Sequence, residues 1–258
     1  LTPGPLTTSE TVKETMMTDW CTWDEDYNLG IVQELRKDLV SIATKNIKDY
    51  TSVLLQGSGT YCVEAVLGAT ITPKDKLLIC SNGAYGDRMG NIAEYYHLDY
   101  DMLAFEETEQ VSVEYVDDYL SNNSDVTHVA FVHCETTTGI LNPIKELSHI
   151  VKMHGKKLIV DCMSSFGGIP LDVNELGIDF LISDASFKFG SRHGLCFGLG
   201  ESHFVTSENN SHTANLCVDS LFDVGNRVPN FYYGIKTVDT QLYQVFKNHV
   251  RSRTSGGK

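Results

Sequence analysis

The chain has 258 residues, of which 41% are hydrophobic and 21% are charged, a composition typical of a globular protein with a sizeable core. Its 20 Lys and Arg residues against 34 Asp and Glu residues give a net charge of −14, which argues against binding to nucleic acid or to an anionic membrane surface. No apolar run approaches the roughly 20 residues that span a bilayer. We therefore expect one large domain or two small ones, with no nucleic-acid partner and no membrane association.

The cysteines point to a reducing compartment. The seven cysteines form no C-x-x-C pair, and several lie inside apolar stretches, where cysteine serves as a small core residue. The chain begins at Leu1 without a signal-peptide pattern, so we expect a cytoplasmic location and leave a mitochondrial targeting segment open.

Helical patterns alternate with short apolar runs along most of the chain. Apolar residues recur at helical spacing over 31–42, after residue 60 as far as Leu67, over 85–97 and over 143–154. Five apolar runs predict strands at 52–56, 77–80, 126–132, 157–160 and 180–182. This alternation predicts an α/β fold with a mostly parallel sheet covered by helices on both faces. From about residue 184 onward, scattered glycines and a polar run give no element that we can assign.

Ligands of such folds gather at the carboxyl ends of the strands, where the chain places a glycine- and hydroxyl-rich segment. Residues 56–60, Gln-Gly-Ser-Gly-Thr, follow the first predicted strand and begin a helix. Their hydroxyl and N–H groups at the positive end of the helix dipole suit a phosphate group. The segment lacks the lysine of a P-loop and the G-x-G-x-x-G spacing, and it would also serve as a plain helix start.

Three other strand ends carry chemistry that suits a flat ring. Tyr85 lies between glycines and would cover a ring or pack in the core. The hydroxyls of residues 136–138 would bind a ligand oxygen or satisfy a turn. Asp161 closes a strand, where a buried carboxylate would pair with the protonated nitrogen of pyridoxal phosphate (PLP) or cap the next helix. We find no metal-ligand spacing and no G-x-S-x-G segment, and the order of these strand ends favours one shared site.

Six segments together resemble the 2-aminoethylphosphonate–pyruvate transaminase family, which belongs to the class V aminotransferases of fold-type I PLP-dependent enzymes: residues 1–8, 19–24, 55–60, 82–86, 133–143 and 161–170. The likeness covers residues 1–183. It implies a fold-type I large domain, a homodimer, and transfer of the amino group of 2-aminoethylphosphonate to pyruvate, giving phosphonoacetaldehyde and L-alanine. Alanine–glyoxylate and serine–pyruvate aminotransferases are similar but match these segments less well.

The resemblance also implies roles for individual residues. It places Ser58, Gly59 and Thr60 at the cofactor phosphate, Tyr85 and Met163 against the pyridine ring, Thr136 near the ring hydroxyl, and Asp161 at the pyridinium nitrogen. The segment 3–5 would border the substrate pocket. A phosphonate needs a compact cationic clamp, for which Arg36 and Arg88 are candidates by residue type.

The family pattern breaks after Ser183. The family's serine-alanine-asparagine-lysine run carries the Schiff-base lysine, whereas here Lys188 lies one residue late, which turns a helical side chain by roughly 100°. We find no match in residues 184–258 and expect the small C-terminal domain of the family to be missing there. We therefore divide the chain into 1–183, part of a PLP-dependent transferase large domain, and 184–258, of uncertain structure. A second hypothesis is a truncated or frame-altered, inactive remnant whose sheet lacks its last strands and exposes an open edge.

Overall fold

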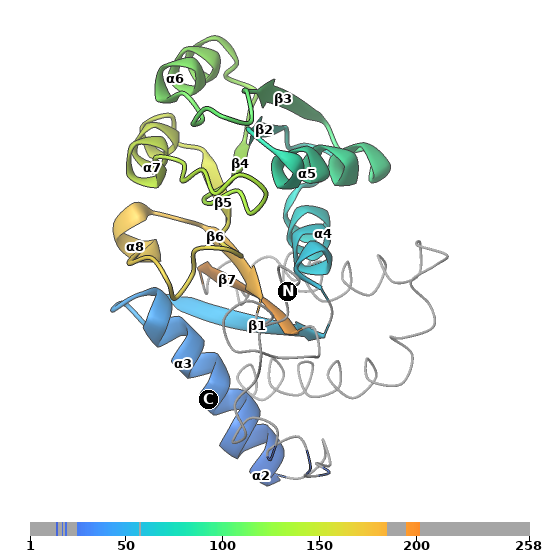
Figure 1. Cartoon of the computed structure of the whole chain (residues 1–258), viewed down its shortest axis with the longest axis vertical. Coiled ribbons are helices and arrows are strands. Elements are labelled where there is room, and N and C mark those ends of the chain that lie inside the picture. Colours follow the sequence, from blue (N-terminus) through green and yellow to red (C-terminus); the bar gives the residue numbers. More distant parts are fainter. Residues whose placement is uncertain are drawn as a thin grey trace, which may run out of the picture.

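The fold is built on one sheet. A computed structural model describes residues 14, 17, 19, 25–56, 58–184 and 195–201. Seven strands lie in the order β1-β7-β6-β5-β4-β2-β3 (Figure 1). Their bounds are β1 (Tyr50–Gln56), β2 (Leu77–Ser81), β3 (Tyr100–Ala104), β4 (His128–Val132), β5 (Lys157–Asp161), β6 (Phe180–Asp184) and β7 (Leu195–Glu201). Because β7 is antiparallel to both of its neighbours and all other pairs are parallel, the other six strands point the same way and share one carboxyl-terminal edge.

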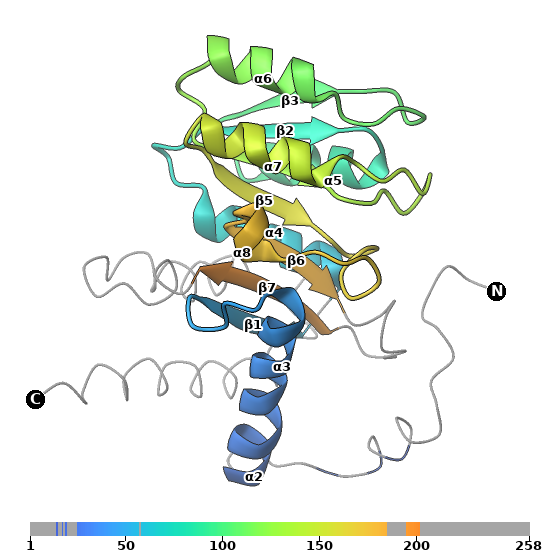
Figure 2. The same ribbon diagram turned by 90° about the vertical axis from the view of Figure 1, so that its left-hand side faces the viewer.

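Helices cover both faces of this sheet, as predicted. They are α2 (Glu25–Tyr27), η1 (Asn28–Val32), α3 (Gln33–Ala43), α4 (Gly59–Thr70), α5 (Ala84–Tyr95), α6 (Val113–Asn122), α7 (Ile144–Met153) and α8 (Val173–Leu176). Helices α6, α7 and α8 lie on one face and α4 and α5 on the other, which the two views at right angles show (Figures 1 and 2). The predicted α/β/α architecture is therefore confirmed. Within the described segments, no helix combines the length and apolar character needed to cross a bilayer.

Two apolar cores separate the three layers. In β2, Leu78 packs into the core with α6 and α7, whereas its neighbours Leu77 and Ile79 pack into the core with α4 and α5. All residues of β2, β4 and β6 are buried, so these strands need apolar side chains on both faces. Each fully buried Leu or Ile stabilises the fold by about 1.5–3 kcal/mol relative to an exposed one. This double burial explains why the central strands are continuous apolar runs in the sequence.

The sequence prediction missed two strands for different reasons. Strand β3 is at the edge of the sheet and half exposed, so its sequence contains no continuous apolar run. Strand β7 is interrupted by Gly198 and Gly200 and lies in the segment 184–258, to which we assigned no structure. It pairs with both β1 and β6, so the open edge that we expected from a sheet lacking its last strands does not occur between these strands. The division of the chain at residue 183 stays a prediction.

Candidate active site

The predicted segments after β1, β2, β4 and β5 all lie at the shared carboxyl-terminal edge. The first of them begins α4, where Ser58 is the N-cap residue and its hydroxyl accepts a hydrogen bond from the Tyr61 N–H at 3.4 Å. This cap orients the first turn of α4, whose N–H groups and positive dipole end face the same edge. The segment therefore has both roles considered from the sequence: it is a helix start, and it has the donors that a phosphate requires.

Gly59 lies against the segment that follows β5. A Cβ atom added to Gly59 would overlap the sulfur of Met163 and lie 3.1 Å from the Asp184 carboxylate at the end of β6. Glycine is therefore favoured here by a close approach, because a larger residue would have to displace the end of the Met163 side chain. The contact brings the ends of β1, β5 and β6 to one place.

Tyr85 is half-buried in the first turn of α5, and Arg88 ties it to the start of α4. The guanidinium carbon of Arg88 lies 5.1 Å from the centre of the Tyr85 ring, and Nη1 donates to the Thr60 hydroxyl at 2.9 Å. A cation thus lies beside the hydroxyl predicted to hold the phosphate. Arg36, the other candidate by residue type, instead donates to the Ser52 carbonyl oxygen at 2.7 Å and to the Thr51 hydroxyl at 2.9 Å, near the start of β1.

Asp161 ends β5 and is 2% exposed. Its Oδ1 accepts a hydrogen bond from the Met163 N–H at 2.9 Å. The residues after it form a turn, and the next helix, α8, has Asp172 as its N-cap, so the alternative that Asp161 caps a following helix is wrong. The contact with Met163 fixes the orientation of the carboxylate without excluding a ligand. Nearby, the hydroxyls of Thr136 and Ser164 share a short hydrogen bond, which joins the turn after β4 to the turn after β5.

Two buried titratable residues after β4 were not singled out from the sequence. His133 shares a hydrogen bond of 2.9 Å between Nδ1 and the Ser165 hydroxyl, and burial lowers its pKa to about 4, which keeps it neutral. Glu135 is fully buried, and burial raises its pKa even though it accepts hydrogen bonds from the Gly86 and Tyr85 N–H groups. The available signal for Glu135 was an acidic residue three positions after a continuous apolar strand, which resembles the signal that identified Asp161 at the end of its strand.

The donor set fits a flat, phosphorylated, basic ring. The hydroxyls of Ser58 and Thr60 at a helix start suit a phosphate, Tyr85 and Met163 offer an aromatic and a soft apolar surface, and Asp161 offers a buried carboxylate for a protonated nitrogen. Lys188 and the segment 3–5 lie outside the described residues.

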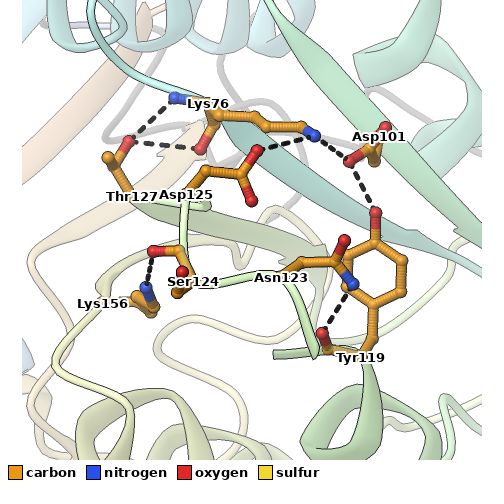
Figure 3. A network of polar contacts seen from close by, with 8 residues as sticks. All are labelled: Lys76, Asp101, Tyr119, Asn123, Ser124, Asp125, Thr127 and Lys156. Carbon is orange, nitrogen blue, oxygen red and sulfur yellow. Dashed lines mark hydrogen bonds and ion pairs between the residues drawn. The ribbon is translucent and has the colours of Figure 1, made fainter. Parts of the chain in front are cut away.

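A second polar cluster lies at the opposite, amino-terminal edge and has a different character (Figure 3). The Lys76 ammonium lies 2.7 Å from an Asp101 carboxylate oxygen and 3.1 Å from one of Asp125, and the Tyr119 hydroxyl also donates to Asp101. The Lys76 N–H donates to the Thr127 hydroxyl at 3.0 Å. These contacts connect β2, β3, α6 and the turn before β4 to one another, so we assign this cluster to the stability of the fold.

Comparisons with known proteins identify the family of the chain. The family model described as aminotransferase class-V matches residues 31–195, which extends the likeness beyond residue 183. A 2-aminoethylphosphonate–pyruvate transaminase of Bacteroides fragilis (strain YCH46) is 86% identical over 186 residues, which are 72% of this chain and 51% of that protein. One of Vibrio cholerae is 56% identical and covers 72% of this chain and 50% of that protein. The chain thus spans about half the length of the curated relatives that it matches.

Solved structures support the fold. An alanine–glyoxylate aminotransferase from Nostoc sp. matches with a TM-score of 0.76 at 23% identity, covering 99% of this chain and 67% of that one. A pyridoxamine–pyruvate aminotransferase from Mesorhizobium loti matches with a TM-score of 0.72 at 23% identity, covering 98% of this chain and 65% of that one. At this identity the likeness establishes the shared architecture and nothing about substrates.

Proposed function

Because the chain belongs to the class V aminotransferase family, we propose that it forms the cofactor-binding part of a PLP-dependent transaminase. The proposed reaction transfers the amino group of 2-aminoethylphosphonate to pyruvate and gives phosphonoacetaldehyde and L-alanine, as the names of its most similar relatives suggest. The observation that carries the proposal is the convergence of the Ser58 cap, Tyr85 and the buried Asp161 at one edge of the sheet. Since the chain spans about half of those relatives, the activity is proposed for the whole protein.

Each described residue then has a physical task. The Ser58 and Thr60 hydroxyls, with the N–H groups at the start of α4, bind the phosphate. Tyr85 and Met163 cover the ring and exclude water from it.

Asp161 holds a proton on the ring nitrogen, and this charge makes the ring attract electrons more strongly. The bound cofactor supplies an electron-poor ring that stabilises negative charge at the carbon bearing the amino group. Thr136 contacts the ring hydroxyl region, and Lys188 is the candidate to carry the cofactor and to move the proton at that carbon.

We also propose a homodimer and a cytoplasmic location. The support for the compartment is chemical: Cys80 and Cys134, within the described part of the chain, are free thiols, as expected in a reducing environment. Size-exclusion chromatography with light scattering tests the oligomeric state, because a dimer has twice the mass of the 28.7 kDa chain.

An inactive remnant is the second candidate, and the position of Lys188 favours it. This lysine lies one residue away from the position that the family pattern requires. Such a protein would still bind PLP at the edge described above but would not complete amino transfer.

One assay separates these candidates. We would load the chain with PLP and measure L-alanine formation from 2-aminoethylphosphonate and pyruvate, with Lys188→Ala as the control. The transaminase is supported if the chain shows sustained turnover and a visible absorption band, and if Lys188→Ala abolishes both. PLP binding without turnover supports the remnant, and absence of PLP binding contradicts both. A band unchanged in Lys188→Ala would show that this lysine does not anchor the cofactor.

A further inference from the structure

We propose that Glu135 is a positioning residue that holds Tyr85 in place over the ligand ring. The inference rests on the proposed function, because Tyr85 has a ligand to cover only if the site binds PLP. Among the interactions described above, the Glu135 side chain reaches one of the predicted site residues, Tyr85 at the start of α5. Its role is therefore to act through Tyr85 rather than on the reacting atoms.

The Glu135 carboxylate accepts hydrogen bonds from the backbone of Tyr85 and of the residue after it. Oε1 of Glu135 accepts hydrogen bonds from the Gly86 N–H at 2.9 Å and from the Tyr85 N–H at 3.1 Å, and Oε2 lies 3.4 Å from the Tyr85 nitrogen. The side chain is 0% exposed, so these bonds are protected from water. A carboxylate at the first turn of a helix also gains from the positive end of the helix dipole. Glu135 thus restrains the main chain of the aromatic residue itself.

Of the two glycines around Tyr85, Gly83 is explained by this close approach, and Gly86 by the approach of Ser81. A Cβ atom on Gly83 would lie 2.8 Å from the Glu135 carboxyl carbon, and one on Gly86 would lie 2.5 Å from the Ser81 hydroxyl oxygen. The Gly83 φ of 169° is extended backbone that any residue can adopt, so the requirement there is space for Glu135. The absence of a side chain at Gly83 therefore lets the carboxylate reach the two N–H groups.

The other end of Glu135 is fixed by the turn after β4. The Glu135 N–H donates to the Ile140 carbonyl oxygen at 3.0 Å, and the Gly139 N–H donates to the Glu135 carbonyl oxygen at 2.8 Å. This turn also contains Thr136, whose hydroxyl is bonded to Ser164. Through its side chain and its main chain, Glu135 therefore sets the aromatic and the hydroxyl groups relative to each other.

Simple stabilisation of α5 is the rival explanation, and affinity and spectroscopy at low temperature distinguish the two. A cap that only stabilises would lower the thermal midpoint and leave a folded protein that binds PLP normally. A positioning residue would alter the PLP dissociation constant and the induced circular dichroism of the bound cofactor, which reports the seating of its ring, in protein that is fully folded.

The experiment uses the full chain and PLP, with three variants and two controls. We expect Glu135→Ala to raise the PLP dissociation constant about tenfold, the loss of one charge-assisted hydrogen bond, and to reduce the induced circular dichroism. Glu135→Gln retains one oxygen for both N–H groups, so it should stay within about threefold of the wild type. Gly83→Ala leaves the carboxylate present but displaces it, and should resemble Glu135→Ala. Glu94→Ala, which removes an exposed carboxylate from α5, and Gly30→Ala, which has open space around it, should match the wild type.

Normal PLP affinity and circular dichroism in folded Glu135→Ala and Gly83→Ala would overturn the inference and leave the proposed function intact. If Glu135→Ala does not fold, Gly83→Ala decides alone. A wild-type chain that does not bind PLP would overturn the proposed function, and the inference with it.

Discussion

At the amino-terminal edge of the sheet, lysines and aspartates stand in pairs, whereas at the carboxyl-terminal edge buried carboxylates accept hydrogen bonds from the backbone. Lys76 joins Asp101 and Asp125, and Asp179 lies within 2.9 Å of two lysine ammonium groups. Asp161, by contrast, accepts from the main-chain N–H of Met163, and Glu135 accepts from two main-chain N–H groups in the first turn of α5. Paired charges hold elements together, whereas a carboxylate oriented by the backbone can offer its charge to a ligand, as proposed for Asp161, or position a neighbouring residue, as proposed for Glu135. Substitutions of the ion pairs at the first edge should therefore change stability, whereas those of Asp161 and Glu135 at the second should change binding and catalysis.

The largest effect should come from Asp161→Asn. The amide can still accept from the Met163 N–H, so the fold is kept, but it carries no charge to hold a proton on the ring nitrogen. We expect kcat to fall by at least about a hundredfold, the scale seen when one electrostatic contact to the transition state is removed. The measurement is L-alanine formation at saturating PLP. Full activity in this variant would remove Asp161 from the site.

Gly59→Ala should affect both stability and binding. The new methyl group would overlap Met163, and overpacking of this kind costs about 1–3 kcal/mol. Displacement of Met163 would also raise the PLP dissociation constant. Urea unfolding and PLP titration measure the two effects, and Gly30→Ala, with no atom within 4 Å, is the matched control. Unchanged values in both measurements would show that the two strand ends are not in contact.

His133→Gln should change the pH dependence of stability. Burial lowers the His133 pKa to about 4 from its usual 6.5, so the unfolded chain takes up the proton first as the pH falls. The stability that His133 contributes is thus complete above pH 6.5 and is lost as the pH falls through 4. We expect the wild type to lose more stability than the variant between pH 7 and pH 4.5, measured as urea midpoints. Parallel losses would contradict the neutral buried state of His133.

Arg88→Ala should weaken PLP binding a few-fold and barely move the thermal midpoint. Arg88 is exposed, and a cation over an aromatic ring at such a site contributes about 0.5–1 kcal/mol. Arg88→Lys keeps the charge but loses the planar contact with Tyr85, so its PLP affinity should lie between those of the wild type and Arg88→Ala. Titrations at low and high salt provide the test, because screening should shrink the difference between wild type and Arg88→Ala.

The smallest effect should come from Lys76→Met, at the other edge. The hydrogen bond from Lys76 lowers the Asp101 pKa, and the hydrogen bond from Tyr119 is the second cause. The ionised Asp101 therefore stabilises the fold above the usual pKa of an aspartate, and this stabilisation is lost as the pH falls through the lowered value. Without Lys76 this contribution shrinks, so the acid unfolding midpoint should move to higher pH. PLP affinity should not change. A change in PLP affinity would contradict the assignment of the Lys76 cluster to the stability of the fold alone.

Local patterns predicted most of this architecture, and contacts between distant segments account for the rest. The strands buried on both faces are continuous apolar runs, so they were found, whereas the half-exposed β3 and the glycine-interrupted β7 were not. The residues of the site that directly follow strands were placed at one edge for the same reason. The approach of Glu135 to Tyr85, 50 residues earlier in the chain, has no local signature, because it depends on how two strand-end turns meet.

The antiparallel strand β7 determines when β1 can pair during synthesis of the chain. Strand β1 ends at Gln56 but pairs with β7, which ends at Glu201, so a ribosome must add a further 145 residues before β1 acquires its neighbour. At synthesis rates of about 5–20 residues per second, this takes roughly 7 to 30 s. During that interval the backbone groups of β1 have no strand partner, and the sheet is complete only when the first and the last of its strands to be synthesised have paired.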